Sequence, residues 1–315
     1  MIKLRKVLTD LKNENLLFYY FWTVFTRIRG IIELNKYSDL ESINRRYKIK
    51  SGRLPNIDDP TLFSEKMQWI KLYYRDDLMT VCADKYAVRE WIEEKGYGET
   101  LNELYEVYED EQDIELSKLP NKFVLKASHG SGWNLIVNDK DEINWFMWRK
   151  IIRSWLSHNI FWAGREWVYT EIKPRIVCEK FLEDASGTLM DYKFHCFNGE
   201  AKFVQVNQGR GNESHTQNFY DLDWNLQLFG KDIMPNHKVD ILPPKQLESM
   251  TKIAKDLSSS FPYARVDFYE VNNKIVFGEI TFFPAGGYPD FRPEEYDLIW
   301  GEMLSLPKKN YQEVA

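Results

Sequence analysis

Residues 263–283, YARVDFYEVNNKIVFGEITFF, constrain the fold more than any other part of this chain. Two runs rich in Val, Ile, Phe and Tyr flank a short polar segment, which is the pattern of a β-hairpin. If residues 272–274 form the loop, Val271 pairs with Ile275, and the register of both strands follows. The segment therefore predicts two antiparallel strands joined by a short turn.

This register places polar side chains on one face of the hairpin. Asp267 lies directly opposite Glu279, and Arg265 lies opposite Thr281. The other face is apolar and consists of Val266, Phe268, Val276, Ile280 and Phe282.

The facing acids Asp267 and Glu279 raise the question of a metal ion. Directly opposed residues have Cβ atoms roughly 5 Å apart, and like charges placed so are destabilising unless something lies between them. A divalent cation would do so, and hard oxygen ligands suit Mg²⁺. The alternative is that this face of the hairpin is simply exposed to solvent and that the loop has another length. A two-residue turn would put the two acids on opposite faces.

Composition limits the classes of function. The length of 315 residues allows one large domain or about two ordinary ones. The 42 basic and 48 acidic residues give a net charge of −6, which argues against nucleic-acid binding by bulk phosphate attraction, although a local basic cleft stays possible. Cys82, Cys178 and Cys196 form neither a zinc pattern nor a disulfide framework, which favours a reducing cytoplasm.

The densest apolar run is LLFYYFWTVF at residues 16–25. It is shorter than the roughly 18 apolar residues that indicate a membrane-spanning helix. No small-residue cleavage site of a secretory leader follows it. We expect an amphipathic helix that packs on the body of the protein, and a contact with a membrane surface is the alternative.

Residues 122–137, KFVLKASHGSGWNLIV, read as a strand, a glycine loop and a second strand. Alternation places Lys126 on the face away from Phe123 and Leu125. The loop can bring backbone N–H groups close to a phosphate, because glycine has no Cβ to block the approach. It is neither a P-loop nor a dinucleotide fingerprint, and an ordinary hairpin turn is the alternative.

Three further segments carry charged side chains in informative places. A helix is expected over residues 84–95, with Asp84 as its N-cap and Lys85 in the first turn, where a cation opposes the helix dipole. Lys85 is thus either a ligand-binding or a solvated lysine. Glu179 interrupts an apolar strand at residues 175–182, and Lys193 shares a strand face with Asp191.

Five runs of this sequence resemble the ATP-grasp superfamily, and more narrowly its TupA-like branch, which is associated with bacterial surface polysaccharide synthesis. They are ADKYAVRE, KFVLKASHGSGWN, KPRIVCEKFLED, DYKFHCFNGE and ARVDFY…FGEITFF. The resemblance covers roughly residues 60 to 305. It implies an α+β fold in which two α+β subdomains close on ATP, here with a helical N-terminal extension.

The resemblance also implies domain limits. They are an N-terminal helical extension at 1–59, a helical and linker region at 60–120, a small subdomain with the glycine hairpin at 121–190, a C-terminal subdomain with the acidic hairpin at 191–306, and a tail at 307–315.

By motif position, the resemblance assigns roles in nucleotide and metal binding. Lys126 and Lys193 would contact the ATP phosphates, with Lys85 beside them, and Asp191 would bind the ribose. The phosphate lid would be Ser128, His129, Gly130, Ser131 and Gly132, and the adenine hinge would be Glu179, Lys180, Phe181 and Leu182. Asp267 and Glu279 would hold Mg²⁺. Thr281 stands where many members have Asn, which puts a second metal position in doubt.

The implied activity is ATP-dependent joining of a carboxylate and an amine through an acyl phosphate, with catalysis by Arg265, Lys126 and Lys193. Arg210 and His215, in the polar loop GRGNESH, are candidates for binding the acceptor carboxylate or the amine, although the loop can also serve solubility alone. The branch implies an amino acid or other amine joined to a uronic-acid carboxylate of a capsule or wall glycan. Residues 1–35 would then hold a cytoplasmic enzyme near the inner face of the membrane.

Three other functions compete with this one. A kinase of a sugar or amino acid would use the same acids and lysines but would release the phosphorylated product. A glycosyltransferase would use a metal motif such as Asp221-Leu222-Asp223, whose surroundings read more like a strand edge and turn. A non-catalytic binding module is disfavoured because the metal and phosphate positions are nearly all present.

Overall fold

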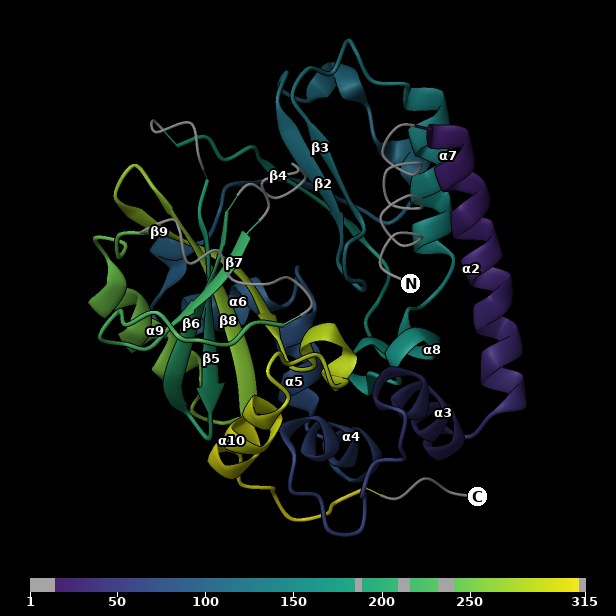
Figure 1. Cartoon of the computed structure of the whole chain (residues 1–315). Coiled ribbons are helices and arrows are strands. Elements are labelled where there is room, and N and C mark those ends of the chain that lie inside the picture. Colours follow the sequence, from purple (N-terminus) through teal and green to yellow (C-terminus); the bar gives the residue numbers. More distant parts are fainter. Residues whose placement is uncertain (1–14, 185–188, 209–215, 232–240, 312–315) are drawn as a thin grey trace. The chain divides into compact units, whose positions relative to one another are not determined.

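The computed structural model describes residues 15–184, 189–208, 216–231 and 241–311 (Figure 1). The chain divides into two compact units. Unit 1 comprises residues 1–38, 84–86 and 103–181, and unit 2 comprises residues 39–83, 87–102 and 182–315. The domain limits expected from the sequence stay a prediction.

Unit 1 contains a four-stranded antiparallel sheet with the strand order β1-β4-β2-β3. Its strands are β1 (Leu104–Tyr108), β2 (Phe123–Ala127), β3 (Asn134–Val137) and β4 (Ile176–Lys180). The strand, loop and strand expected over residues 122–137 are confirmed as β2 and β3.

Helix α7 (Trp145–Leu156) covers one face of this sheet, and Asn144 caps its N-terminus by accepting a hydrogen bond from the amide of Met147. The apolar face of α7 meets the alternate side chains of the strands, as the period of two in a strand requires. The core residues shared by sheet and helix include Phe123, Leu125, Leu135, Ile151, Ile152 and Trp155.

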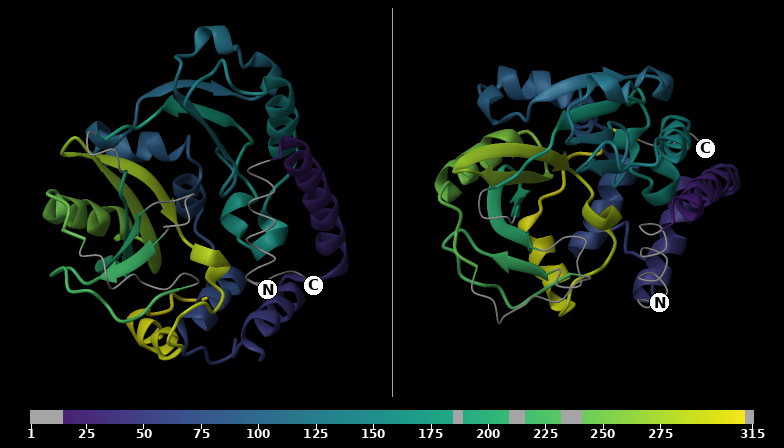
Figure 2. Two further views of the ribbon diagram at one scale, coloured as in Figure 1. Left: turned by 45° about the horizontal axis from the view of Figure 1, so that its top comes forward. Right: turned by 90° about the horizontal axis from the view of Figure 1, so that it is seen from above.

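Helix α2 (Leu16–Lys36) runs alongside α7 and the short α8 (Phe161–Gly164) (Figures 1 and 2). Asn15 caps it, because its side chain accepts a hydrogen bond from the amide of Phe18 at 3.0 Å. The expected helix in this region is thus present. None of the helices in the described part of the chain is both long and apolar enough to cross a membrane.

Unit 2 contains a five-stranded antiparallel sheet with the strand order β7-β6-β5-β8-β9. In this order the strands are β7 (Thr216–Tyr220), β6 (Glu200–Gln208), β5 (Asp191–Phe197), β8 (Tyr263–Val271) and β9 (Lys274–Thr281). Helix α9 (Leu247–Ser258) packs on β5, β6 and β8 and buries Met250, Ile253, Ala254 and Leu257.

The remaining helices of unit 2 are α3 (Asp39–Ser51), α4 (Phe63–Tyr73), α5 (Asp77–Ala83), α6 (Val88–Glu94) and α10 (Glu295–Met303). Trp300 of α10 is fully buried, and the aromatic rings of Phe63, Phe203 and Phe291 lie within 5.4 Å of its own. Short 3-10 helices occur in both units. Those of unit 1 are η2 (Glu111–Asp113), η3 (Leu116–Lys118) and η4 (Trp167–Tyr169), and those of unit 2 are η1 (Gly98–Thr100) and η5 (Pro284–Gly287).

The helix expected over residues 84–95 begins later than the sequence predicts. Helix α6 starts at Val88, and Lys85 lies in the turn before it. The carboxylate of Asp84 accepts a hydrogen bond from the amide of Tyr86 at 2.9 Å, so Asp84 forms a turn with the residue two positions on instead of capping the helix. The expectation that the helix dipole opposes Lys85 is therefore wrong.

Candidate active site

The acidic hairpin has the register that the sequence predicts at its functional end. In the ladder between β8 and β9, Asp267 pairs with Glu279 and Arg265 pairs with Thr281. These four side chains therefore share one face of the sheet of unit 2.

The turn of this hairpin differs from the expectation. Val271 pairs with Lys274 and not with Ile275, so the loop contains only Asn272 and Asn273. Both have left-handed backbones, with φ of 50° and 63°, which is the conformation that two-residue hairpin turns require and that Asn tolerates. The predicted three-residue loop is wrong.

A β-bulge reconciles the short turn with the paired acids. Phe268 pairs with Phe277 while Asp267 pairs with Glu279, so Gly278 is an extra residue in β9. The extra residue shifts the register by one and returns both acids to the same face. Gly278 suits this position because a Cβ there would lie 3.0 Å from the carbonyl oxygen of Asp267.

The guanidinium of Arg265 holds the polar face of the hairpin together. It donates two hydrogen bonds to Asp267, from Nε to Oδ1 at 2.7 Å and from Nη2 to Oδ2 at 2.8 Å. The same Nη2 lies 3.0 Å from Thr281 Oγ1 and 3.4 Å from Glu279 Oε1. Burial lowers the pKa of Arg265, but the Asp267 carboxylate outweighs burial and raises this pKa overall, so the side chain stays charged.

The neighbouring strand β5 adds a second cation and a third acid. Lys193 pairs with Asp267 across the ladder, and its Nζ donates to Asp267 and, at 2.9 Å, to Asp191. The side chains of all three are at least 95% buried. Burial raises the pKa of Asp267, and the positive charges of Arg265 and Lys193 oppose that rise. We call Asp191, Lys193, Arg265, Asp267 and Glu279 the acid–base cluster.

The acid–base cluster changes the argument for a metal ion. Arg265 and Lys193 already neutralise the facing acids, so like-charge repulsion alone does not require a divalent cation. The donor chemistry still fits Mg²⁺, since Asp267, Glu279 and Thr281 offer oxygen atoms on one face and the Glu279 side chain is 37% exposed. With all five side chains ionised, the three carboxylates and two cations of the cluster carry a formal charge of −1.

Within the described residues, no group of three or more His, Cys, Asp or Glu side chains is arranged to hold a metal ion. The expected ligand set contains only two such residues, Asp267 and Glu279, besides Thr281. The metal role of these three residues stays a prediction.

In unit 1, Lys126 and Glu179 form an ion pair on the sheet face away from the core. The distance from Lys126 Nζ to Glu179 Oε2 is 2.6 Å. Antiparallel pairing of β2 with β4 brings them together, because Lys126 pairs with Val177 and Val124 pairs with Glu179. The expected separation of Lys126 from Phe123 and Leu125 is confirmed by their alternating burial.

The glycine loop is anchored by Lys85. Its Nζ donates to the carbonyl oxygen of Gly130 at 2.7 Å, which ties the turn before α6 to the loop. Gly130 must lack a side chain, because a Cβ would lie 2.4 Å from the Trp133 ring, and Gly132 has a left-handed φ of 73°. The structure thus brings together Lys85 and the loop, and their role in phosphate binding stays a prediction.

The first two residues of the expected lid point into the protein. Ser128 and His129 are fully buried, and a ring nitrogen of His129 lies 2.9 Å from the carbonyl oxygen of Trp155. Burial lowers the pKa of His129. Ser131 and Gly132 are exposed. The lid role of these residues stays a prediction.

The expected adenine hinge falls where the chain leaves unit 1. Strand β4 ends at Lys180, and the last of the three segments of unit 2 starts at Leu182, directly after Phe181. Lys180 is held at this exit by Glu103, whose carbonyl accepts from its amide at 2.9 Å and whose carboxylate accepts from its Nζ at 3.0 Å. Base recognition by residues 179–182 stays a prediction, and Arg210 and His215 lie outside the described residues.

Sequence reasoning missed two buried cations. Lys71 of α4 is 1% exposed, and its Nζ donates to Gln68 Oε1 at 2.9 Å and to the carbonyl of Gly286 at 2.5 Å. Lys231 pairs with Asp290 at 3.3 Å. The sequence places Lys71 between Ile70 and Leu72 but does not show that it is buried.

Comparison with known proteins decides the family. The family model described as TupA-like ATPgrasp matches residues 65–305, which is most of the chain. The chain belongs to this family. The TupA-like ATP-grasp protein accordingly has the α+β, ATP-grasp fold that the sequence predicts, with two units that each combine an antiparallel sheet with helices. No curated protein matches it.

The solved structures that this chain matches are more distant in sequence. The TupA-like protein is 17% identical to the D-alanine–D-alanine ligase of Bacillus anthracis complexed with ATP, with a TM-score of 0.37 over 64% of this chain and 55% of the other. The ligase of the same name from Helicobacter pylori is 14% identical, with a TM-score of 0.39 over 72% and 60%. The L-amino acid ligase of Bacillus licheniformis is 13% identical, with a TM-score of 0.37 over 74% and 44%. The match thus spans about half the length of these proteins.

Proposed function

We propose that the TupA-like ATP-grasp protein is an ATP-dependent ligase that joins a carboxylate to an amine through an acyl phosphate. The observation that carries the proposal is the bulged hairpin, which puts Arg265, Asp267, Glu279 and Thr281 on one face beside Lys193. Phosphoryl transfer needs such a combination of cations and oxygen ligands.

ATP would be held mainly by charge and by backbone groups. Lys126, Lys85 and the glycine loop in unit 1, together with Lys193 in unit 2, would neutralise the phosphates. Glu179, Lys180, Phe181 and Leu182 would read the adenine edge, and Asp191 would bind the ribose. Lys85 and the carbonyl of Gly130 support this assignment, because their hydrogen bond fixes the loop beside a cation.

Asp267, Glu279 and Thr281 would hold Mg²⁺, which when bound neutralises and orients the phosphates of ATP. Arg265 would pass one or more of its hydrogen bonds from these residues to the transferring phosphoryl group. Its raised pKa keeps it a donor throughout the reaction.

The reaction has two steps. In the first, a carboxylate oxygen of the acceptor attacks the γ-phosphorus of ATP, the bond to the β-phosphate oxygen breaks, and ADP leaves. In the second, the amine attacks the acyl carbon, the C–N bond forms, and phosphate leaves with the electron pair while the amine proton passes to solvent. Arg265, Lys126 and Lys193 would stabilise the charge that develops on the phosphoryl oxygens.

Product identification tests this proposal. The full chain is incubated with ATP, Mg²⁺ and a panel of uronic acids, with and without amino acids, and ADP and the organic products are measured by mass spectrometry. An amide that appears only when both partners are present supports the ligase. A phosphorylated product that accumulates unchanged in the presence of amines would instead identify a kinase.

We further propose that the acceptor is a uronic-acid glycan or its precursor in capsule or wall polysaccharide synthesis, and that the amine is an amino acid or a similar small molecule. Arg210 and His215 are the candidates for binding the acceptor carboxylate or the amine. The support is the resemblance of the family motifs. Replacing Arg210 by Met is expected to raise KM for the acceptor or the amine while ATP affinity stays the same.

Association with the inner face of the membrane is part of the same proposal, and α2 supports it. The helix buries small or polar residues, Thr23, Gly30 and Glu33. A second set of apolar residues on this helix faces outward, and those more than half exposed include Leu17, Phe21, Phe25, Ile28 and Ile32. Their spacing of three or four residues forms one stripe along the helix.

The exposed Arg27 and Arg29 lie on opposite flanks of this stripe. An apolar stripe flanked by basic residues fits the headgroup region of a membrane that contains anionic lipids. Cosedimentation with phosphatidylglycerol vesicles tests this, and a variant with both Phe21→Ser and Phe25→Ser is expected to lose binding. Phe146→Ser, which changes an exposed phenylalanine of α7, is the matched control. Equal sedimentation of both variants would contradict membrane association.

A further inference from the structure

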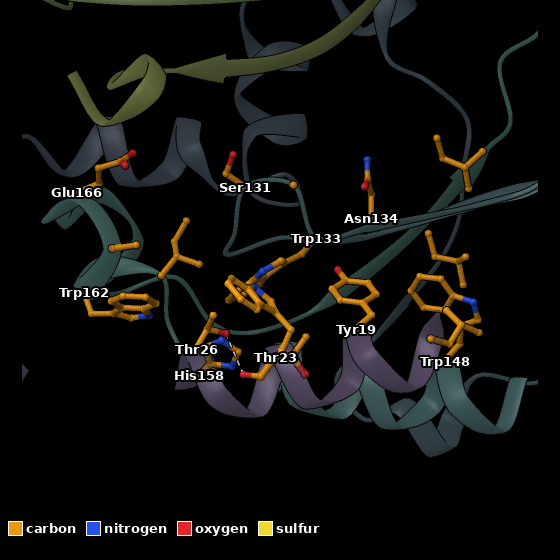
Figure 3. A pocket seen from close by; sticks show the side chains of 17 residues that line it. Tyr19, Thr23, Thr26, Ser131, Trp133, Asn134, Trp148, His158, Trp162 and Glu166 are labelled. Carbon is orange, nitrogen blue, oxygen red and sulfur yellow. Dashed lines mark hydrogen bonds between the residues drawn. The ribbon is translucent and has the colours of Figure 1, made fainter. Parts of the chain in front are cut away.

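Unit 1 contains a cavity that shares Ser131 and Gly132 with the glycine loop and is otherwise lined by residues without a role above. Its volume is about 680 Å³, within the range of roughly 300–1,000 Å³ that is usual for small-molecule sites. Helix α2, the end of the glycine loop, strand β3 and helix α8 form its walls (Figure 3).

Aromatic side chains make up much of the wall. Figure 3 shows Trp162, Trp133, Tyr19 and Trp148 in a row along the cavity. Two glycines leave room for the indole rings. A Cβ on Gly130 would collide with Trp133, and a Cβ on Gly30 of α2 would lie 2.6 Å from Trp162. The backbone is therefore adapted to hold these rings at the cavity.

Polar side chains form a separate rim. Glu166, Ser131 and Asn134 point to the same side of the cavity, away from the row of rings (Figure 3). Ser131 and Asn134 are exposed, whereas Trp133 is half-buried. His158 lies below, with its ring centre 4.8 Å from that of Trp133. Apolar surface and hydrogen-bonding groups thus occupy different sides of one space.

The charge of the wall restricts the ligand. Among the described residues that line the cavity there is one acid, Glu166, and no Lys or Arg. Arg29 lies 5.8 Å from the centre of the Trp162 ring but is not part of the lining. Within the described part of the lining, a phosphate or a carboxylate would therefore find no cation.

We propose that this cavity binds a neutral pyranose ring of a saccharide. Such a ring has C–H groups on its faces, which pack against aromatic side chains, and hydroxyl groups around its edge, which hydrogen-bond to a polar rim. The identification of that saccharide with the uncharged part of the acceptor glycan rests on the proposed ligase function, with the uronic acid itself bound elsewhere.

Direct binding without ATP tests the cavity separately from the ligase. Saturation-transfer NMR and tryptophan fluorescence are recorded with the full chain and a panel of neutral disaccharides and trisaccharides of glucose, galactose and N-acetylglucosamine. At least one neutral saccharide is expected to bind. Absence of binding across this panel, or displacement of the saccharide by tetramethylammonium, which would indicate an ammonium site, would overturn the proposal.

Two variants locate the binding. Trp162→Ala and Asn134→Ala are each expected to weaken saccharide binding by about tenfold. Trp162→Ala removes an aromatic surface that packs against the face of the pyranose, and Asn134→Ala removes a hydrogen-bonding group for its hydroxyls. Asn138→Ala, at an exposed asparagine just beyond β3, and Phe146→Ala are the matched controls and are expected to bind like the unchanged protein. Equal affinity of Asn134→Ala and Asn138→Ala would overturn the proposal even if Trp162→Ala failed to fold.

The outcomes for the cavity and the ligase are distinguishable. Asp267→Asn, which is expected to stop ATP turnover, should leave saccharide binding unchanged. A protein that binds neutral saccharides but forms no amide would keep the cavity assignment and lose the ligase. A protein that forms amides but binds no neutral saccharide would keep the ligase and lose the cavity assignment.

Discussion

The two units hold their functional lysines in different ways. In unit 1, Lys126 forms one ion pair with Glu179, and the Lys126 side chain is 25% exposed. In unit 2, Lys193 contacts two carboxylates, and its side chain is 3% exposed. A lysine near water can turn toward a ligand at little cost, whereas Lys193 is held between two buried carboxylates. Under the proposed function, unit 1 would make adaptable phosphate contacts and unit 2 would supply a preorganised centre.

The largest effect is expected from Lys193→Met. This change leaves Asp191 and Asp267 buried with one cation fewer, and breaking a buried ion pair from one side costs about 3–5 kcal/mol. Urea denaturation at pH 7 measures the loss in the free energy of unfolding. A loss below about 1 kcal/mol, the usual value of an exposed pair, would contradict the claim that Lys193 is held more firmly than Lys126.

Gly278→Ala is expected to cost less, about 1–3 kcal/mol. The new Cβ would lie 3.0 Å from the carbonyl oxygen of Asp267, so the bulge must open. ATP turnover should fall together with stability, because the bulge keeps Asp267 and Glu279 on the same face. Lys274→Ala, at the exposed turn end of β9, is the control. Full activity of Gly278→Ala would show that the bulge does not position the acids.

A pH effect is expected from His195, which is fully buried between Tyr263 and Gln205. Burial, together with the charges of Lys231 and Arg265, lowers its pKa well below the usual value. The unfolded chain therefore takes up a proton first as the pH falls below about 6.5, and stability declines by up to about 1.4 kcal/mol per pH unit.

The difference in unfolding free energy between the unchanged protein and His195→Gln, followed from pH 7.5 to 5.5, isolates this contribution. The slope should flatten in the variant. Parallel pH profiles would mean that His195 takes up its proton in the folded protein as readily as in the unfolded chain.

The smallest stability effect is expected from Lys126→Met. The exposure of Lys126 limits the cost to about 1 kcal/mol. Its ATP affinity should nevertheless fall, which isothermal titration would measure. A stability loss as large as that of Lys193→Met would remove the distinction between the units.

The acidic hairpin shows how far sequence patterns reach. The register of Asp267 and Glu279 was predictable because apolar and polar side chains alternate on both strands. The turn was not, because a two-residue loop with a bulge and a three-residue loop without one place the acids alike. Only Gly278, a glycine within a strand, carried a signal of the bulge.

Three other features were missed because they depend on contacts between segments far apart in the sequence. Asp84 can cap a helix or form a turn of its own, and the choice depends on contacts with distant residues such as Arg175. The outward apolar face of α2 was also hidden, because periodicity shows that a helix has two faces and does not show which one is buried. Cations such as Lys71 were missed because burial follows from packing between segments far apart in the sequence.

The most direct test of the central claim is Glu279→Gln, which keeps the size of the side chain and removes its charge. Mg²⁺-dependent release of ADP with a productive uronic acid and amine is measured beside the unfolding midpoint, with Glu270→Gln in β8 of the same hairpin as the control. The account predicts that Glu279→Gln loses turnover by at least about a hundredfold, with ΔΔG‡ near 2.7 kcal/mol, while both variants stay folded. Turnover of Glu279→Gln equal to that of Glu270→Gln would contradict the assignment of this hairpin as the catalytic centre.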